Sequence, residues 1–489
     1  MRKASAGLLA VLFVLWSGTA AESPALSDDG ALSFSSWVVV QNPSADAATV
    51  GIVYATPCDP ATPDYTAVVP SVASDVVSVG EAFPGPWGAA AMVSSDVPVV
   101  ATQTFLWSDA GGSTQWASHG GGVPVPSRTW YLGEATTYGE FESYVFLWNP
   151  GPDTATAQIT YLLPGETRTG PQVTLNPTAQ KEIPMSEAAP DAWSASAVVT
   201  ADAPIVAFLS TYNQRDGASF HQAGVPTPAT SWYLAEGTTE PWSGFETWIV
   251  VQNPNDTPAT VGLAFQSEGV LHPGPTQTIP PMTHAAWAAA DSFPNRMQFT
   301  TVVTSDVPVV ATQTRTWDNR HGIDSTLGAP SPSSTWYFPA GPSHTEAESW
   351  LVLINPGSEP VRASIDFLTP GGPFGAPPLT LDPLGRDSIS LPPEVNGQMT
   401  YSVAVTSDTP ILVLQGTYWE TASGSHQDTS FGVTSPATTW YLPPTPHRPQ
   451  PMDSGSAGQT EDGDRDGDGV PDGEDLCPDF PGAPATSGC

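Results

Sequence analysis

Carboxylates crowd the C-terminal end of the chain, in a stretch that is chemically unlike everything before it. From Asp464 to Pro478 the sequence reads Asp-x-Asp-x-Asp-Gly-x-x-Asp-x-x-Asp-x-Cys-Pro. Carboxylates at every second position of a tight loop converge on one point, and hard oxygen ligands in that number select Ca²⁺. The stretch therefore predicts a calcium site, against the alternative of an acidic disordered tail.

This spacing resembles a thrombospondin type 3 repeat, a family whose aspartates wrap calcium and whose cysteines form disulfides. The resemblance covers residues 461–489 and implies these metal ligands, the last through its backbone carbonyl: Asp464, Asp466, Asp468, Asp472, Asp475 and Val470. It also assigns Gly469 to the turn. An EF-hand loop shares several of these positions, but Pro471 and Pro478 oppose its flanking helix. Family members stack several copies, whereas this chain has one.

The chain has three cysteines. Cys477 and Cys489 bracket a loop rich in Pro and Gly, and we expect them to form a disulfide. Cys58 is then left over in a turn-like segment, as an exposed thiol or as a handle for an intermolecular bridge.

Residues suited to catalysis are few. His119, His221, His321 and His426 fall at about the same place in successive repeats, which favours structural hydrogen bonding over metal binding or catalysis. The usual hydrolase, metalloprotease and phosphate-loop motifs are absent from the sequence. The sequence thus predicts a protein that is not an enzyme. The alternative is a carbohydrate-active or other hydrolytic enzyme, with acid chemistry from Glu134, Glu236 or Glu246.

Three signatures that recur at a period of about 104 residues must position these groups. A Trp-Tyr-Leu or Trp-Tyr-Phe segment begins at Trp130, Trp232, Trp336 and Trp440. An apolar strand closes on Asn-Pro at Asn42, Asn149, Asn253 and Asn355. A Ser/Ala-Asp-x-Pro segment centres on Asp96, Asp202, Asp306 and Asp408. We expect the tryptophans to be core residues, the Asn-Pro pairs to be turns, and the aspartates to cap tight turns between two strands.

Within the third copy, alternation and turn residues predict seven short strands: 232–236, 246–252, 259–266, 276–279, 285–289, 298–304 and 307–316. Seven strands in about a hundred residues are typical of an immunoglobulin-like sandwich. The strand at Trp248 is apolar on both faces, which suits a closed β-propeller whose blades stack. The trailing Trp440 segment would then close the ring.

The predicted fold is therefore all-β, with four tandem sandwich repeats and a calcium-binding tail; the alternative is a closed propeller. The predicted divisions are a signal peptide (1–21), repeats at 22–134, 135–236, 237–340 and 341–444, a linker (445–460) and the tail (461–489).

Composition and the N-terminus both indicate export. Arg2 and Lys3 precede an apolar core and small residues suited to cleavage, typical of a secretory signal peptide. The formal net charge of −36 excludes nucleic acid as a partner. We find no stretch able to span a bilayer as a helix, and we expect a secreted or cell-surface location.

Residues 31–444 resemble tandem modules of uncharacterised function in secreted and surface proteins of bacteria, which carry the same Trp-Tyr-Leu and Asn-Pro signatures. The resemblance implies location and architecture. Together with the tail, it leads to the hypothesis of a secreted or cell-surface structural and adhesive protein. Its partner would be an extracellular protein or glycan that the sequence does not name.

Overall fold

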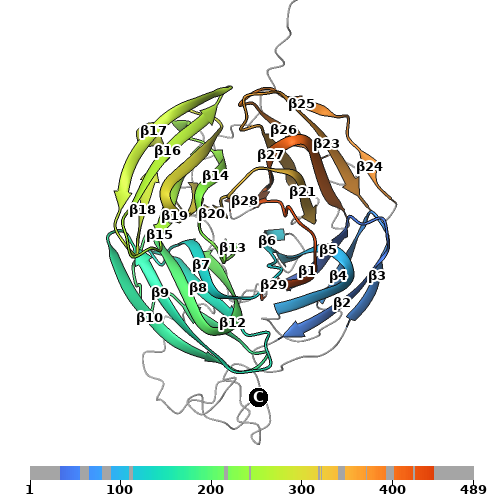
Figure 1. The fold of residues 1–489 in the computed structure, drawn as a ribbon, viewed down its shortest axis with the longest axis horizontal. Helices are drawn as coiled ribbons and strands as arrows, with labels where there is room; N and C mark the ends of the chain where they lie inside the picture. Colours follow the sequence, from blue (N-terminus) through green and yellow to red (C-terminus); the bar gives the residue numbers. More distant parts are fainter. Residues whose placement is uncertain are drawn as a thin grey trace, which may run out of the picture.

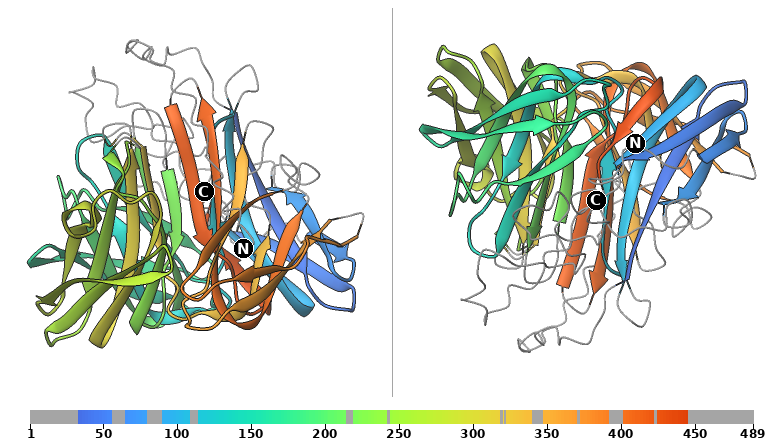
Figure 2. Two further views of the ribbon diagram at one scale, coloured as in Figure 1. Left: turned by 90° about the horizontal axis from the view of Figure 1, so that it is seen from above. Right: turned by 90° about the horizontal axis from the view of Figure 1, so that it is seen from below.

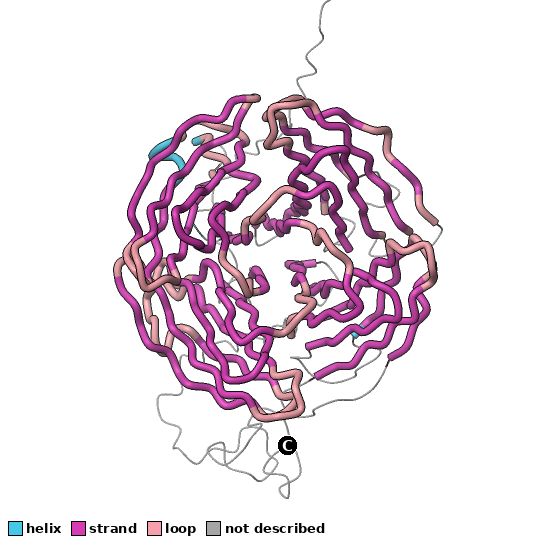
Figure 3. The backbone as a smooth tube through the Cα atoms, viewed as in Figure 1, coloured by secondary structure: helices cyan, strands magenta, loops and turns pink. Residues whose placement is uncertain are grey.

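The computed structural model describes residues 33–55, 65–79, 90–108, 114–213, 219–241, 244–317, 320, 322–339, 347–369, 372–391, 401–421 and 424–444. This part of the chain is almost entirely β-structure (Figure 3), with a short helix at α2 (Ala289–Ser292). Four antiparallel sheets follow one another around a ring (Figure 1). The prediction of an all-β fold built from repeated sheets is confirmed.

The four sheets share one arrangement of paired strands. The first consists of β1 (Ser33–Asn42), β2 (Ala48–Ala55), β3 (Tyr65–Val69), β4 (Ala73–Ser78), β5 (Ala90–Ser108), β6 (Thr114–Gly121) and β29 (Ala437–Leu442). The second consists of β7 (Ser127–Ala135), β8 (Phe141–Trp148), β9 (Ala155–Leu163), β10 (Glu166–Leu175), β11 (Gln180–Pro184), β12 (Ala195–Asn213) and β13 (Ser219–Ala223).

The other two sheets repeat this plan. The third consists of β14 (Ala229–Gly237), β15 (Glu246–Asn253), β16 (Ala259–Ser267), β17 (Val270–Ile279), β18 (Thr283–Ala288), β19 (Phe299–Trp317) and β20 (Gly322–Leu327). The fourth consists of β21 (Ser333–Pro339), β22 (Glu348–Ile354), β23 (Val361–Leu368), β24 (Phe374–Gly375), β25 (Leu379–Leu381), β26 (Arg386–Ser390), β27 (Ser402–Thr421) and β28 (Gly424–Phe431).

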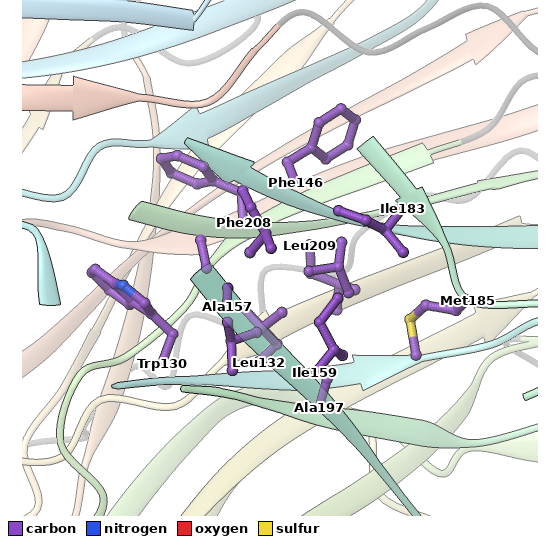
Figure 4. Close-up of a cluster of buried hydrophobic side chains, with 14 of the residues drawn as sticks. Trp130, Leu132, Phe146, Ala157, Ile159, Ile183, Met185, Ala197, Phe208 and Leu209 are labelled. Atoms are coloured by element: carbon purple, nitrogen blue, oxygen red, sulfur yellow. The ribbon is translucent and has the colours of Figure 1, made fainter. Parts of the chain in front are cut away.

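One long strand organises each sheet. In the third, the first half of β19 pairs with β14 and β16, and the second half pairs with β15 and β20. Side chains from both halves, including Val303 and Val310, enclose one apolar core with Trp232 and Phe265. Figure 4 shows the equivalent core of the second sheet. Each unit is thus sandwich-like, with two sheet halves that share a strand.

The long strand corrects one sequence-based expectation. Residues 298–304 and 307–316 were expected to be two strands joined by a turn at Asp306, but β19 runs through them without interruption. The Asp306 carboxylate instead accepts a 2.7 Å hydrogen bond from the backbone N–H of Thr260 on β16. This bond lowers the pKa of Asp306. The pairing register with β14 shifts between Thr304 and Val309, so the strand passes from one sheet half to the other here.

The repeated tryptophans are core residues, as expected. Trp130, Trp232, Trp336 and Trp440 are each at most 2% exposed. Each indole N–H donates to the carbonyl of the residue after the repeated proline, at 2.7 to 2.9 Å: Ile205, Val309, Ile411 and Val99. A buried indole needs such a partner, because an unpaired buried N–H is costly.

The repeated asparagines form turns, also as expected. The Asn253 amide donates to the carbonyls of Thr257, Ile279 and Pro280, at 2.9 to 3.1 Å. Its side-chain oxygen accepts from the backbone N–H of Asn255. Equivalent bonds surround Asn42, Asn149 and Asn355. One buried amide therefore ties the turn after β15 to the end of β17.

The chain closes the ring on itself. β29 pairs with β5 of the first sheet, with Trp440 opposite Val93. The other Trp-Tyr-Leu and Trp-Tyr-Phe strands each pair with the long strand that comes next in the chain: β7 with β12, β14 with β19 and β21 with β27. The units are therefore arranged as in the propeller alternative rather than strung out as separate modules. Figure 2 shows the ring from the side, with many strands crossing its thickness.

Neighbouring units bury the second face of the central strands. Ile249, Val250 and Val251 are all buried, as the two-sided apolar pattern predicts. Next to them, the Gln252 amide donates to the carbonyl of Ala197 in the second unit, at 3.1 Å. Gln41 in the first unit makes the same kind of bond to Val403 in the fourth, at 3.0 Å.

Candidate functional site

The centre of the ring is lined by one strand from each sheet: β6, β13, β20 and β28, here called the axial strands (Figure 1). β6 contacts β13 and β28, and β20 contacts the same two strands. Each axial strand is the edge partner of a long strand, so the four repeats bring their edges together around one axis. Side chains at equivalent positions of different repeats therefore meet there.

The four histidines are not equivalent in the structure. His119 lies opposite Thr104, and His221 lies opposite Ser210, at the same register position of their sheets. In the third and fourth sheets that position holds Ser325 and Thr429. His426 lies three residues earlier on β28 and stacks on Trp419, with ring centroids 5.6 Å apart, and His321 is outside the described residues. The prediction that the histidines occupy equivalent places is therefore wrong for His426. The loops before the axial strands differ in length, so similar sequence spacing does not give the same register position.

His119 links the first repeat to the fourth. Its Nδ1 contacts the Asp428 carboxylate, and its Nε2 lies 2.5 Å from Ser430 Oγ. Ser118 Oγ donates to the other Asp428 oxygen at 3.3 Å. We call His119, Asp428 and Ser430 the His119 clasp. Asp428 and Ser430 are two residues apart on β28, so they bracket the imidazole from the facing strand.

Carboxylates set the charge of the clasp. Burial alone lowers the pKa of His119, but Asp428 and, less strongly, Asp324 raise it above its ordinary value. A neighbouring anion favours the protonated imidazole, in which both ring nitrogens donate hydrogen bonds. His221, which lacks such a carboxylate, has its pKa lowered to about 3 by burial and by His119.

An ion network lies beside the clasp. The Arg315 guanidinium donates to Asp324 at 2.8 Å and to Thr429 Oγ1 at 2.8 Å, and lies 3.7 Å from Glu236. Glu236 also pairs with Arg386, and the Tyr418 hydroxyl donates to it at 3.4 Å. We call these six residues the axial network: Glu236, Arg315, Asp324, Arg386, Tyr418 and Thr429. It joins the third sheet to the fourth.

Because the axial network is buried, the stability of each of its charged groups depends on the partner that it contacts. Burial raises the pKa of Asp324, and Arg315 offsets part of that rise. For Arg315, burial lowers the pKa, but Tyr418, Asp324 and Glu236 outweigh it and hold the guanidinium charged. A buried charge that loses its partner is strongly destabilising. The arrangement therefore holds the third and fourth repeats in one relative position.

A third buried cluster lies between the second and third sheets. Ser194 Oγ donates to Glu134 at 3.0 Å and lies 2.9 Å from His284 Nε2, while Ser196 Oγ lies 3.1 Å from His284 Nδ1. Burial raises the pKa of Glu134 well above its usual range and lowers that of His284 to about 4. Burial thus disfavours the charged form of both groups, and the cluster is a hydrogen-bonded contact between the two sheets.

The structure does not gather the three glutamates of the enzyme alternative. Glu134 belongs to the cluster with His284, and Glu236 belongs to the axial network. Glu246 is on the surface, where Arg320 donates to it at 2.8 and 2.9 Å. Each glutamate thus has a separate set of partners, whereas glycosidases place two carboxylates across one bond.

Several sequence-predicted sites lie outside the described residues. These are the calcium ligands Asp464, Asp466, Asp468, Val470, Asp472 and Asp475, the pair Cys477 and Cys489, Cys58, and the signal peptide. In the part of the chain that is described, no three His, Cys, Asp or Glu side chains gather as metal ligands would. Nor does that part contain a helix with the length and apolar character needed to cross a bilayer.

Sequence reasoning missed the axial partners. Asp428 is 309 residues from His119, and Thr429 is 114 from Arg315. One signal was present, because Arg315 replaces the uncharged residues Phe105, Thr211 and Thr417 found at its position in the other sheets. A lone cation in a buried strand requires a partner anion.

Comparisons with known proteins find a partial match to one family model. Residues 226–438, less than half of the chain, match the model of DUF5719, a family of unknown function. No curated protein matches the sequence.

Among solved structures, Thermotoga maritima 1070 is 20% identical, covering 21% of this chain and 94% of its own, with a TM-score of 0.18. The Anabaena sensory rhodopsin transducer is 23% identical, covering 18% and 87%, with a TM-score of 0.16. A tetra-tandem repeat from the extending region of a large adhesion protein is 10% identical, covering 84% and 100%, with a TM-score of 0.10. Similarity at these TM-scores supports no conclusion about this chain.

Proposed function

We propose that this protein is a secreted or cell-surface structural and adhesive protein and not an enzyme. The observation that carries the proposal is the pairing of β29 with β5, which joins the last repeat to the first in one sheet. Closure pairs the last repeated strand with the first sheet, so the described repeats form a continuous ring. The result is a rigid β-scaffold on which surface side chains can bind a partner.

The repeated residues support a scaffold role. The signature tryptophans, asparagines and aspartates all form hydrogen bonds within the fold. These side chains therefore stabilise the fold. The N-terminal signal-like segment and the acidic composition favour work outside the cell.

Attachment of the purified chain to cells tests this function. Fluorescently labelled full-length protein should be retained on washed cells of the producing organism, and unlabelled protein should compete. The location is tested by fusing residues 1–31 to a phosphatase that is active only outside the cytoplasm. A matched fusion carrying Leu12→Arg should be inactive, because a charge interrupts the apolar core. Equal activity of both fusions, with no retention on cells, would overturn the proposal.

We also propose that residues 461–489 bind calcium. The donor set fits, because five carboxylates and one carbonyl are hard oxygen ligands of the kind calcium takes. Calcium would remove the repulsion between them, so binding and ordering of the tail should be a single event.

Calorimetry on the full chain tests the calcium proposal. Asp466→Ala and Asp468→Ala should weaken calcium binding strongly. Arg465→Ala is the matched control and should leave it nearly unchanged. Magnesium should substitute poorly, since it requires octahedral geometry. Absence of calcium uptake at millimolar concentration, with Cys477 and Cys489 oxidised, would refute the site.

One observation favours a second candidate function, acyl hydrolysis. Ser430, His119 and Asp428 are connected in the order that activates a serine hydroxyl in hydrolases. In that role Ser430 Oγ would attack an ester carbonyl while neutral His119 accepts its proton and passes it to the departing alcohol. Water, activated by His119 in the same way, would then cleave the acyl-serine and release the acid. Covalent labelling by a fluorophosphonate that Ser430→Ala abolishes would establish this function. The scaffold proposal expects no labelling.

A further inference from the structure

Two tryptophans meet on the surface where the second and third repeats join. Trp193 precedes β12 and is 49% exposed, and Trp248 on β15 is partly exposed. Their ring centroids are 5.5 Å apart, with the rings tilted by 58°. Large aromatic side chains are usually buried, so an exposed pair that spans two repeats points to a binding surface.

Charged groups flank the pair. The Arg320 guanidinium carbon lies 5.8 Å from the centre of the Trp248 ring. Arg320 also donates to Glu246 through two nitrogens, and Glu246 accepts from the Trp248 indole N–H at 3.3 Å. We call Trp193, Trp248, Glu246 and Arg320 the seam platform. It presents aromatic faces beside a carboxylate and a guanidinium that remain about half exposed to solvent.

The loop that carries Trp193 is held in place. Thr137 donates its backbone N–H to the Ala192 carbonyl at 2.8 Å, and its hydroxyl accepts from the Ala192 N–H at 3.0 Å. The Thr136 hydroxyl donates to the same carbonyl at 3.2 Å. Because the backbone is fixed and an indole has few rotatable bonds, little conformational entropy would be lost on binding.

We infer that the seam platform binds a neutral glycan, an inference that rests on the proposed adhesive function and names its ligand class. The apolar C–H face of a sugar ring can stack on an indole, while its hydroxyls hydrogen-bond to Glu246 and Arg320. The net charge of −36 disfavours anionic glycans. Pairing of Glu246 with Arg320 neutralises the platform locally, so nothing in it favours a cationic peptide.

Calorimetry and indole fluorescence with neutral hexasaccharides built from glucose, xylose, mannose or N-acetylglucosamine test the inference. The full-length protein should bind at least one of them, with a change in fluorescence. Trp193→Ala should weaken that binding by about tenfold or more, the factor that ~1.4 kcal/mol of lost contact gives. Thermal unfolding should change little, because Trp193 is half exposed.

Met297 provides the matched control. It lies 104 residues after Trp193, at the corresponding place in the next repeat, and is 42% exposed. Met297→Ala should bind the glycan like the unmodified chain. Equal binding by both variants, or no binding by the unmodified chain, overturns the inference. If labelled protein is still retained on cells in either case, the adhesive function stands and only the glycan platform fails.

Discussion

The positions that repeat around the ring and the positions that meet at its axis behave in opposite ways. The indole of Trp232 donates to Val309, and those of the three other signature tryptophans donate to the same place in their own sheets. At the axis, one register position holds His119, His221, Ser325 and Thr429 in turn. Residues that repeat in every sheet therefore determine the fold of each unit, whereas residues that differ between the sheets form the contacts at the axis.

Charge explains why the axis cannot repeat. Equivalent positions of the four repeats face one another there, so four copies of Asp428 would place like charges together in a buried space. The carboxylates of Glu236, Asp324 and Asp428 instead contact the guanidinium groups of Arg315 and Arg386 and the imidazole of His119. The raised pKa of His119 favours a positive charge beside Asp428.

Loss of a repeated tryptophan should give the largest effect on stability. Trp232→Ala and Trp336→Ala remove equivalent indoles that are 1% and 2% exposed. Each should lower the free energy of unfolding by about 3 to 5 kcal/mol, because a large cavity remains. Denaturant unfolding measures this, with half-exposed Trp193→Ala as the control. A much smaller loss at one of the two sites would mean that the repeats are not structurally equivalent.

The local elements could be predicted from the sequence, because they depend on residues close together in the chain. The burial of Trp232 and the turn at Asn253 follow from such patterns. The uninterrupted β19 could not be predicted in this way, because Asp306 and Pro308 are residues typical of a turn. They lie within a strand here, where Thr260 of β16 donates a hydrogen bond to Asp306.

Closure of the ring could not be decided from the sequence. The Trp440 strand pairs with β5, whose residues around Val93 resemble those of the other long strands. A further repeat placed after Trp440 would offer the same pairing, so local pattern fits both arrangements. The axial contacts could not be predicted from the sequence for a related reason, because only closure of the ring brings Asp428 next to His119.

Loss of a repeated asparagine should have an intermediate effect. Asn253→Ala removes an amide that satisfies three carbonyls, two of which lie at the end of the neighbouring strand. Unsatisfied buried groups cost roughly 1 to 3 kcal/mol, so the free energy of unfolding should fall by about that amount. Asn149→Ala should match it, and the control Asn255→Ala should cost less. Parallel losses in denaturant midpoint would confirm that the turns are interchangeable.

The smallest effect should come from the axis and should depend on pH. The pKa of His119 is raised in the folded state, above about 6.5 in the unfolded chain. Its contribution to stability is therefore complete below about pH 6.5 and is lost as the pH rises through the folded-state pKa. The pKa of His221 is lowered to about 3, so its contribution is present above about pH 6.5 and is lost as the pH falls toward 3.

Two matched variants isolate these opposite signs at one register position. Glutamine keeps hydrogen-bonding groups but does not titrate in this range, so His119→Gln should lower the melting temperature more at pH 5.5 than at pH 8. His221→Gln should do the reverse, because it removes a group whose protonation destabilises the folded state. The groups facing His119 are Asp428 and Ser430 from β28, Asp324 from β20 and His221 from β13, and all remain in the first variant. Parallel pH profiles for the two variants would show that the Asp428 carboxylate does not distinguish these histidines, and that the axis is as symmetric as the sheets around it.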